Sequence, residues 1–206
     1  MKSMFFRFNV LVFFGLIGGL VSGCLLKSST VPIRHFVLTP ISTNAPASAE
    51  HLSVEIGFVK MPAYLLRSSM ALRTGANEIE YLEDAQWAER LDQAFQRTLA
   101  ANLSRLLLVE TNHAAGARRD RPLARVSVNV QQFDVDARGQ GGLIAQWRLS
   151  AADADAPSKS GEAKVLRAGP SPHGKPEVIA ATLSELVTEF SQNLAQSIRE
   201  SLPPNQ

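Results

Sequence analysis

The sequence contains very little cysteine, and this scarcity excludes two ways of stabilising a fold. One cysteine occurs among 206 residues, so the chain forms neither an internal disulfide nor a zinc site built on several cysteines. A chain of this length buries enough apolar surface to fold without either. The role of Cys24 is therefore the first question that the sequence poses.

An excess of charge of one sign is also missing. The chain has 21 Lys and Arg residues against 19 Asp and Glu residues. Residues 1–23 hold Lys2 and Arg7 and no acid, so the remainder carries 19 charges of each sign. Nucleic-acid binding requires a concentrated basic surface, and the remaining basic residues are scattered along the chain. We therefore predict no nucleic-acid partner.

Common catalytic and metal-binding motifs are absent as well. The sequence has no GxSxG, GxxxxGK[ST], HExxH or CxxC pattern, and its four histidines share no ligand spacing. The glycines of residues 138–142 lie between two predicted strands, which is typical of a turn, whereas a phosphate-binding loop opens a helix. We predict a protein that is not an enzyme and that has no metal and no bound cofactor.

The N-terminus has the layout of an export signal. Residues 1–7 are short and positively charged, and residues 10–21 follow without a charged or strongly polar side chain. This apolar run is shorter than the about 20 residues that span a bilayer. The next residues, Val21, Ser22, Gly23 and Cys24, resemble the bacterial lipobox, in which small residues admit a signal peptidase and the cysteine thiol accepts diacylglycerol. The alternative is an ordinary signal peptide or uncleaved anchor in which the cysteine falls by chance.

The lipobox divides the chain into three expected parts. We predict a signal peptide at residues 1–23, a lipidated N-terminus and tether at residues 24–33, and one folded domain at residues 34–202. Cys24 would carry diacylglycerol and an N-acyl chain such as palmitate, and three acyl chains hold a protein permanently to a membrane. In the lipoproteins that this lipobox resembles, Asp directly after the cysteine favours inner-membrane retention. The resemblance therefore implies that a protein with Leu25 at this position is transferred to the outer membrane of a Gram-negative bacterium, facing the periplasm.

The exported part alternates between two hydrophobic periods. Period-two patterns and turn residues predict short strands, and a shift of phase after Val130 predicts a β-bulge near Gln131 and Gln132. The expected strands are residues 34–39, 51–59, 68–73, 78–82, 109–111, 126–135, 143–149 and 161–168. Period-3.6 patterns predict one amphipathic helix from Asp84, with Trp87 on its apolar stripe, and a second from Pro176. We expect Trp147 to face the core.

This order of elements predicts an α+β fold. The expected architecture is a single two-layer domain with a mixed or antiparallel sheet and two long amphipathic helices on one face. The acidic residues Glu78, Glu80, Glu83 and Asp84 would then stabilise the N-terminus of the first helix, by about 0.3–1 kcal/mol each. A cation site is the less favoured interpretation of these four residues.

An apolar segment stands out between two of the predicted strands. Pro62, Tyr64, Leu65 and Leu66 would lie at a loop or strand opening. They are candidates for a contact with a partner or with lipid. The alternative is that they fill the core.

Four segments together resemble a known family. They are Val59–Leu65 (VKMPAYL), Glu78–Tyr81 (EIEY), Gln86–Leu91 (QWAERL) and Leu99–Leu103 (LAANL). This pattern is similar to the ABC-type transport auxiliary lipoprotein family, which comprises the PqiC/YmbA-like intermembrane transport lipoproteins. The resemblance covers most of residues 34–200. It implies a periplasmic lipoprotein whose partners are a mammalian-cell-entry (MCE) domain protein and an inner-membrane ABC or PqiA-like component.

Two functions are compatible with these observations. The first is a non-catalytic lipoprotein that docks the MCE-protein assembly at the outer membrane in a system that moves lipid between the two membranes. The second is a lipid-carrying binding lipoprotein whose helices cover an internal acyl-binding cavity. Homo-oligomer formation stays open, because one sequence does not reveal which sheet edges are uncovered.

Overall fold

The computed structural model describes residues 31–42, 53–107, 110–113, 124–151 and 158–201. The chain divides into two units, Met1–Pro32 and Ile33–Gln206, and the elements below all belong to the second. They are β1 (Arg34–Phe36), β2 (Ser53–Lys60), the short 3₁₀ helix η1 (Ala63–Leu66), β3 (Ser69–Gly75), β4 (Glu78–Trp87), α2 (Leu91–Leu107), β5 (Glu110–His113), β6 (Ala124–Val135), β7 (Gln140–Ala151), β8 (Lys159–Ala168) and α3 (Pro176–Arg199). The domain boundaries expected at residues 24, 34 and 202 stay predictions.

The strands form two sheets. The main sheet has the order β5-β2-β6-β7-β8, in which β2 runs parallel to both β5 and β6, and β6, β7 and β8 are antiparallel. The small sheet has the order β1-β4-β3, with β1 parallel to β4 and a β3–β4 hairpin. A parallel bridge between Arg73 and Asp136 joins β3 to the chain just after β6. The predicted α+β class is confirmed. The prediction of one sheet is wrong, because the strands form two sheets.

Pro62 accounts for this division. Proline has no backbone N–H to donate to a strand ladder, so β2 ends before it at Lys60 and the chain turns through η1. Leu65, which is 3% exposed, fixes that turn in the core. The β3–β4 hairpin therefore begins in a new direction and pairs with β1 instead of extending the main sheet.

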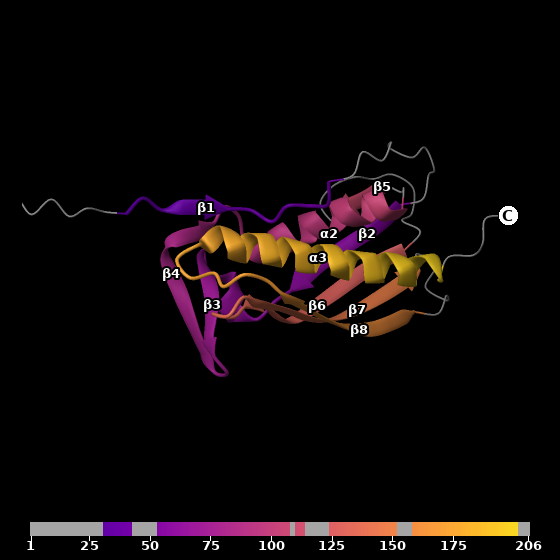
Figure 1. Cartoon of the computed structure of the whole chain (residues 1–206). Coiled ribbons are helices and arrows are strands. Elements are labelled where there is room, and N and C mark those ends of the chain that lie inside the picture. The colour runs from indigo at the N-terminus through magenta and orange to yellow at the C-terminus, as the bar shows by residue number, and fades with distance from the viewer. Residues whose placement is uncertain (1–30, 43–52, 108–109, 114–123, 152–157, 202–206) are drawn as a thin grey trace, which may run out of the picture. The chain divides into compact units, whose positions relative to one another are not determined.

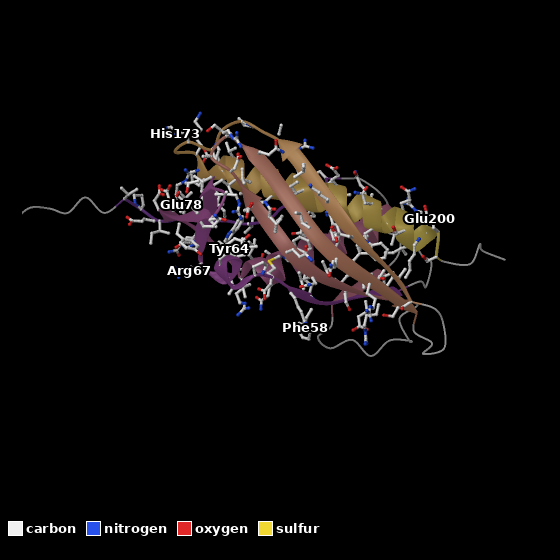
Figure 2. The ribbon with its side chains drawn as sticks, turned by 90° about the horizontal axis from the view of Figure 1, so that it is seen from below. Phe58, Tyr64, Arg67, Glu78, His173 and Glu200 are labelled. Atoms are coloured by element: carbon white, nitrogen blue, oxygen red, sulfur yellow. The ribbon has the colours of Figure 1, made fainter. Side chains whose placement is uncertain are left out.

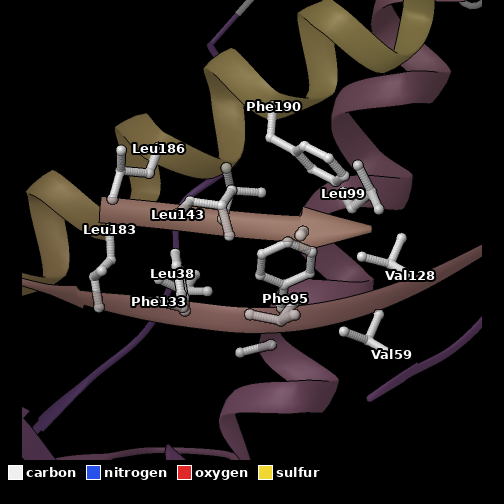
Figure 3. Packing of buried hydrophobic residues seen from close by; sticks show 14 of the residues in the cluster. Leu38, Val59, Phe95, Leu99, Val128, Phe133, Leu143, Leu183, Leu186 and Phe190 are labelled. Carbon is white, nitrogen blue, oxygen red and sulfur yellow. The ribbon is translucent and has the colours of Figure 1, made fainter. Parts of the chain in front are cut away.

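Both long helices lie on the same face of the main sheet, as predicted (Figure 1). Helix α2 packs on β2 and β5, and α3 packs on β6, β7 and β8. Three fully buried phenylalanines join the two layers: the Phe95 ring meets Phe133 edge-on at 5.3 Å between centroids and lies 6.0 Å from Phe190 (Figure 3). The core therefore lies between the helices and one side of the sheet.

The first helix begins later than its periodicity predicted. The expected start at Asp84 is wrong, because residues through Trp87 belong to β4 and α2 begins at Leu91. Trp87 pairs with Phe36 of β1, and its N–H donates to the carbonyl of Ser68 at 2.8 Å. Neighbouring strands on both sides thus hold this segment extended, which outweighs the local helical pattern.

The four acidic residues before the helix consequently lie in a strand. Glu78, Glu80, Glu83 and Asp84 all belong to β4, so the expected stabilisation of a helix N-terminus is wrong. Side chains of a strand alternate between its two faces, which separates Glu78 and Glu80 from Glu83. The first three are exposed.

Other local predictions are confirmed. The β6–β7 pairing shifts register between Val130 and Gln132, where the bulge was expected. Pro176 occupies the first turn of α3. Trp147 is partly buried and packs against the core, and it lies over Gly161, where a Cβ atom would be only 2.7 Å from the Trp147 ring. A glycine is therefore needed opposite this tryptophan.

The segment after β1 crosses the two helices. Leu38 is 1% exposed, and its carbonyl accepts a hydrogen bond from the Arg97 guanidinium at 3.1 Å. The N–H of Thr39 donates to Ser184 Oγ at 3.1 Å, and the N–H of Ile41 donates to Asn102 Oδ1 at 2.9 Å. Buried polar side chains of α2 and α3 thus fix the chain where it enters the domain.

Candidate functional site

The predicted lipidation site lies outside the described residues. Val21, Ser22, Gly23 and Cys24 all fall within residues 1–30, so their roles in signal-peptide cleavage and lipid attachment stay predictions. In the part of the chain that the structure describes, no helix has both the length and the apolar character needed to cross a membrane.

The segment Pro62–Leu66 is organised around one short helical turn. The N–H of Leu65 donates to the Pro62 carbonyl at 3.0 Å. Leu65 points into the core, whereas Pro62, Tyr64 and Leu66 are partly exposed. Core packing thus accounts for Leu65. The predicted contact with a partner or with lipid stays a prediction, and only the other three side chains are exposed enough to make it.

Tyr64 belongs to a hydrogen-bonded network around a buried carboxylate. Its hydroxyl donates to Asp134 Oδ2 at 2.9 Å, and Arg73 donates to the same carboxylate through Nε at 3.1 Å and Nη2 at 2.5 Å. Gln132 Nε2 is the fourth donor atom, at 2.9 Å from Asp134 Oδ1. Asp134 is only 2% exposed. The network, called the Asp134 network below, therefore ties η1 and β3 to β6.

Both titratable partners of Asp134 are held in one protonation state. Burial raises the pKa of the Tyr64 phenol well above its usual value, and the neighbouring Asp134 carboxylate raises it further. Hydrogen bonding to Asp134 raises the pKa of the Arg73 guanidinium. A protonated phenol and a charged guanidinium supply neither a nucleophile nor a general base at neutral pH. The Asp134 network is thus a cross-link between elements.

No metal centre is found among the described residues. Within them, no three His, Cys, Asp or Glu side chains converge closely enough to hold an ion. The acidic side chains of β4 are included in that statement, since all of β4 is described.

The side of the main sheet away from the helices is uncovered over much of its area (Figure 2). An open depression of about 970 Å³ lies on this side, across β2, β6, β7 and β8. The charged and aromatic residues of its lining are Glu55, Phe58, Lys60, Arg125, Trp147, Arg148 and Glu162. We call this surface the open face. Phe58 is 81% exposed there, the largest exposure among the large hydrophobic side chains of the described residues.

A β-bulge directs Phe58 outward. Val126 and Val128 of β6 pair with Ile56 and Val59 of β2, so β2 has one residue more than β6 between these pairs. The extra residue returns Val59 to the core, where it is 7% exposed, and leaves Phe58 on the outside. Bulges commonly redirect a side chain in this way near functional sites.

The open face was not among the sites predicted from the sequence. Unbroken period-two alternation from the buried Val54 and Ile56 would bury Phe58 as well. The one local signal is Gly57, since an isolated glycine within a strand pattern often marks a bulge. A Cβ atom at Gly57 would lie 3.3 Å from the Val126 carbonyl oxygen, so the close approach of β2 to β6 favours glycine at that position.

The interior between the helices and the sheet is tightly filled beside Trp87. The depression there, lined among others by Leu65, Trp87, Phe133 and Leu183, has a volume of about 10 Å³. That is room for about one water molecule, and it leaves no space for an acyl chain at this point of the core.

Known proteins resemble this chain in sequence pattern and in fold. The model of the family described as ABC-type transport auxiliary lipoprotein component matches residues 36–195. The crystal structure of an uncharacterized protein shares 19% identity and superimposes with a TM-score of 0.67, covering 81% of this chain and 99% of that one. A protein from Xanthomonas campestris shares 13% identity with a TM-score of 0.64, covering 82% of this chain and 95% of that one. No curated protein matches the chain.

Proposed function

The chain belongs to the ABC-type transport auxiliary lipoprotein component family, and from this membership we propose that it is an outer-membrane lipoprotein that docks an MCE-protein assembly. The membership makes the protein an auxiliary, lipoprotein component of an ABC-type transport system. The finer proposal is that the domain faces the periplasm and forms the outer-membrane end of a path along which lipid moves between the two membranes. In this role it binds and positions a partner and performs no reaction.

The single observation that carries the proposal is the extent of the family match. Residues 36–195 include strands β2 to β8, all of α2 and most of α3, so the match concerns most of the folded domain. Two further features support a docking role. The Asp134 network and the buried core join the elements to one another, which suits a module that binds a partner without rearranging. The open face offers a surface that no other part of the described domain covers.

The proposal includes a covalent anchor at Cys24. After cleavage between Gly23 and Cys24, the thiol would bear diacylglycerol and the new amino group an acyl chain. Several acyl chains bind a membrane far more strongly than one, which gives only marginal attachment. The domain would then remain at the membrane throughout its function.

The anchor is tested by substituting the cysteine. We expect Cys24→Ala to abolish metabolic labelling with palmitate and to release the protein from the membrane fraction, while Ser28→Ala, a change in the tether, leaves both unchanged. Cys24→Ala should also fail to complement a deletion strain. Full complementation by a soluble Cys24→Ala protein would contradict the role of the anchor.

The choice of membrane is tested by the residue after the cysteine. We expect the lipoprotein to sediment with outer membranes in a density gradient and Leu25→Asp to shift it to inner membranes. An inner-membrane position of the unaltered protein would contradict the proposed docking site.

The docking role is tested by identifying the proteins and lipids that bind to the full-length protein. Full-length protein, solubilised from membranes and purified through a tag, should recover an MCE-domain protein that mass spectrometry identifies. Recovery of a stoichiometric lipid without that partner would favour the lipid-carrying alternative.

A further inference from the structure

The open face combines an exposed aromatic side chain with free polar groups. Phe58 projects from β2 next to the depression (Figure 2). Burying a phenylalanine stabilises a protein by about 1.5–3 kcal/mol relative to leaving it exposed, and the bulge in β2 forgoes that gain. The fold thus presents Phe58 to the surroundings at a site where simple alternation would have buried it.

Charge on the open face is unbalanced. Arg125 pairs with Glu55 at 2.8 Å, so these two charges offset one another. Lys60 and Arg148 form no ion pair with any other described residue, and the same holds for Lys164, which lies on the same side of β8 as Glu162. Among the described residues, the open face therefore has three cations without an ion pair and one such carboxylate, that of Glu162. The exported part of the chain, by contrast, carries equal numbers of positive and negative charges.

Aromatic and arginine side chains are the groups that most often carry binding energy in protein interfaces. Complementary charge around them steers the partner and fixes its orientation. We propose that the open face, centred on Phe58, is the surface that binds the transport partner, and that the partner contributes an acidic segment bearing an apolar side chain that packs on Phe58. This inference rests on the proposed function, because it assigns that function's binding step to a particular surface.

The location differs from the candidate contact segment named from the sequence. In the segment Pro62–Leu66, Leu65 is part of the core and the Tyr64 phenol is hydrogen-bonded to Asp134. On the open face, by contrast, the side chains of Phe58, Lys60 and Arg148 are exposed and have no partner within the described domain. A second copy of this chain is the competing occupant, since its β4 carries the exposed Glu78, Glu80 and Glu83.

The test measures binding of purified full-length lipoprotein, in detergent, to the purified MCE-domain protein of the same transport system. We expect Phe58→Ser to weaken binding by about tenfold or more, which is the effect of losing a central aromatic contact. Arg148→Glu should weaken binding and reduce its dependence on salt. Val37→Ser serves as the matched control, because Val37 is another exposed apolar residue, 51% exposed, that lies after β1 and away from the open face. Its affinity should equal that of the unaltered protein.

Folding and oligomeric state are measured on the same variants, by thermal unfolding and by light scattering. Equal binding by the unaltered protein, Phe58→Ser and Arg148→Glu would overturn the assignment of the surface and leave the proposed function intact. Absence of binding by the unaltered protein would overturn the proposed function itself, and the surface assignment with it. Self-association that Phe58→Ser abolishes, with partner binding unchanged, would make a second copy the occupant and overturn the inference.

Discussion

Two phenylalanines of the main sheet, Phe133 and Phe58, lie in opposite environments. Phe133 of β6 points toward the helices, is fully buried and meets Phe95 edge-on. Phe58 of β2 lies on the other side and is 81% exposed. The same residue type therefore stabilises the fold on one side of the sheet and is available for binding on the other.

The side of the main sheet away from the helices is itself divided into two regions. At one end η1 and β3 cover it, and the carboxylate of Asp134 is buried under Tyr64 and Arg73. Elsewhere the sheet is open and its charges meet solvent. The difference teaches that polar residues on this side serve two purposes: where another element covers them they join that element to the sheet, and where nothing covers them they remain free for a partner.

The largest expected effect on stability concerns the side of the main sheet that packs against the helices. Phe133→Ala removes a buried ring and leaves a cavity, so we expect the free energy of unfolding to fall by about 3–5 kcal/mol. Urea denaturation followed by circular dichroism measures this change. A loss below about 1 kcal/mol, the range of conservative core changes, would contradict the packing of Phe133 between the sheet and α2.

A smaller loss of stability is expected at Asp134, on the other side of the main sheet, where η1 and β3 cover it. Asp134→Asn removes the charge that Arg73 and Tyr64 bind, and should destabilise the domain by about 1–3 kcal/mol. Glu55→Gln is the matched control, because it breaks the Arg125–Glu55 pair of the open face, where Arg125 is largely exposed. Such exposed pairs contribute about 0–1 kcal/mol. Equal losses in the two variants would show that the two regions do not differ.

The Asp134 network also predicts a dependence on alkaline pH. The pKa of Tyr64 is raised in the folded state, so above the usual tyrosine pKa of about 10 the unfolded chain loses this proton while the folded chain keeps it. The free energy of unfolding should therefore fall with rising pH from that point, and less steeply in Tyr64→Phe. Denaturation series at increasing pH test this, and parallel curves for the two proteins would argue against a phenol held by Asp134.

The smallest effect on stability is expected at Phe58. Phe58→Ser removes a side chain that contacts little of the protein, so the free energy of unfolding should change by no more than about 0.5 kcal/mol. The melting temperature of the purified domain measures this. A large loss would place Phe58 in the core and remove the contrast with Phe133.

Much of the fold could be predicted because its signals are local. The apolar stripe of α3, with Pro176 in its first turn, needs only helical periodicity. The bulge in β6 followed from the change of phase after Val130, and the strands predicted at residues 68–73 and 78–82, which became β3 and β4, followed from period-two patterns and turn residues. Each pattern lies within one element and its nearest neighbours.

One prediction failed and one feature was not predicted, because both depend on residues that are distant in the sequence. Trp87 fits the spacing of helix α2, yet β1, about fifty residues earlier, pairs with it and makes it part of a strand. Asp134 gave no signal as the centre of a network, since its partners Tyr64 and Arg73 lie 70 and 61 residues away. Local propensity cannot register such pairings.

By itself the sequence determined the α+β class, the two amphipathic helices and the family resemblance, because hydrophobic periodicity, turn residues and short motifs are properties of contiguous segments. Only the tertiary structure decided which residues face outward. The register between β2 and β6 turns Phe58 out of the core, and the covering of one end of the sheet by η1 and β3 buries Asp134 while the rest stays open. Exposure depends on which elements pack together, and that is decided by contacts between segments distant in the chain.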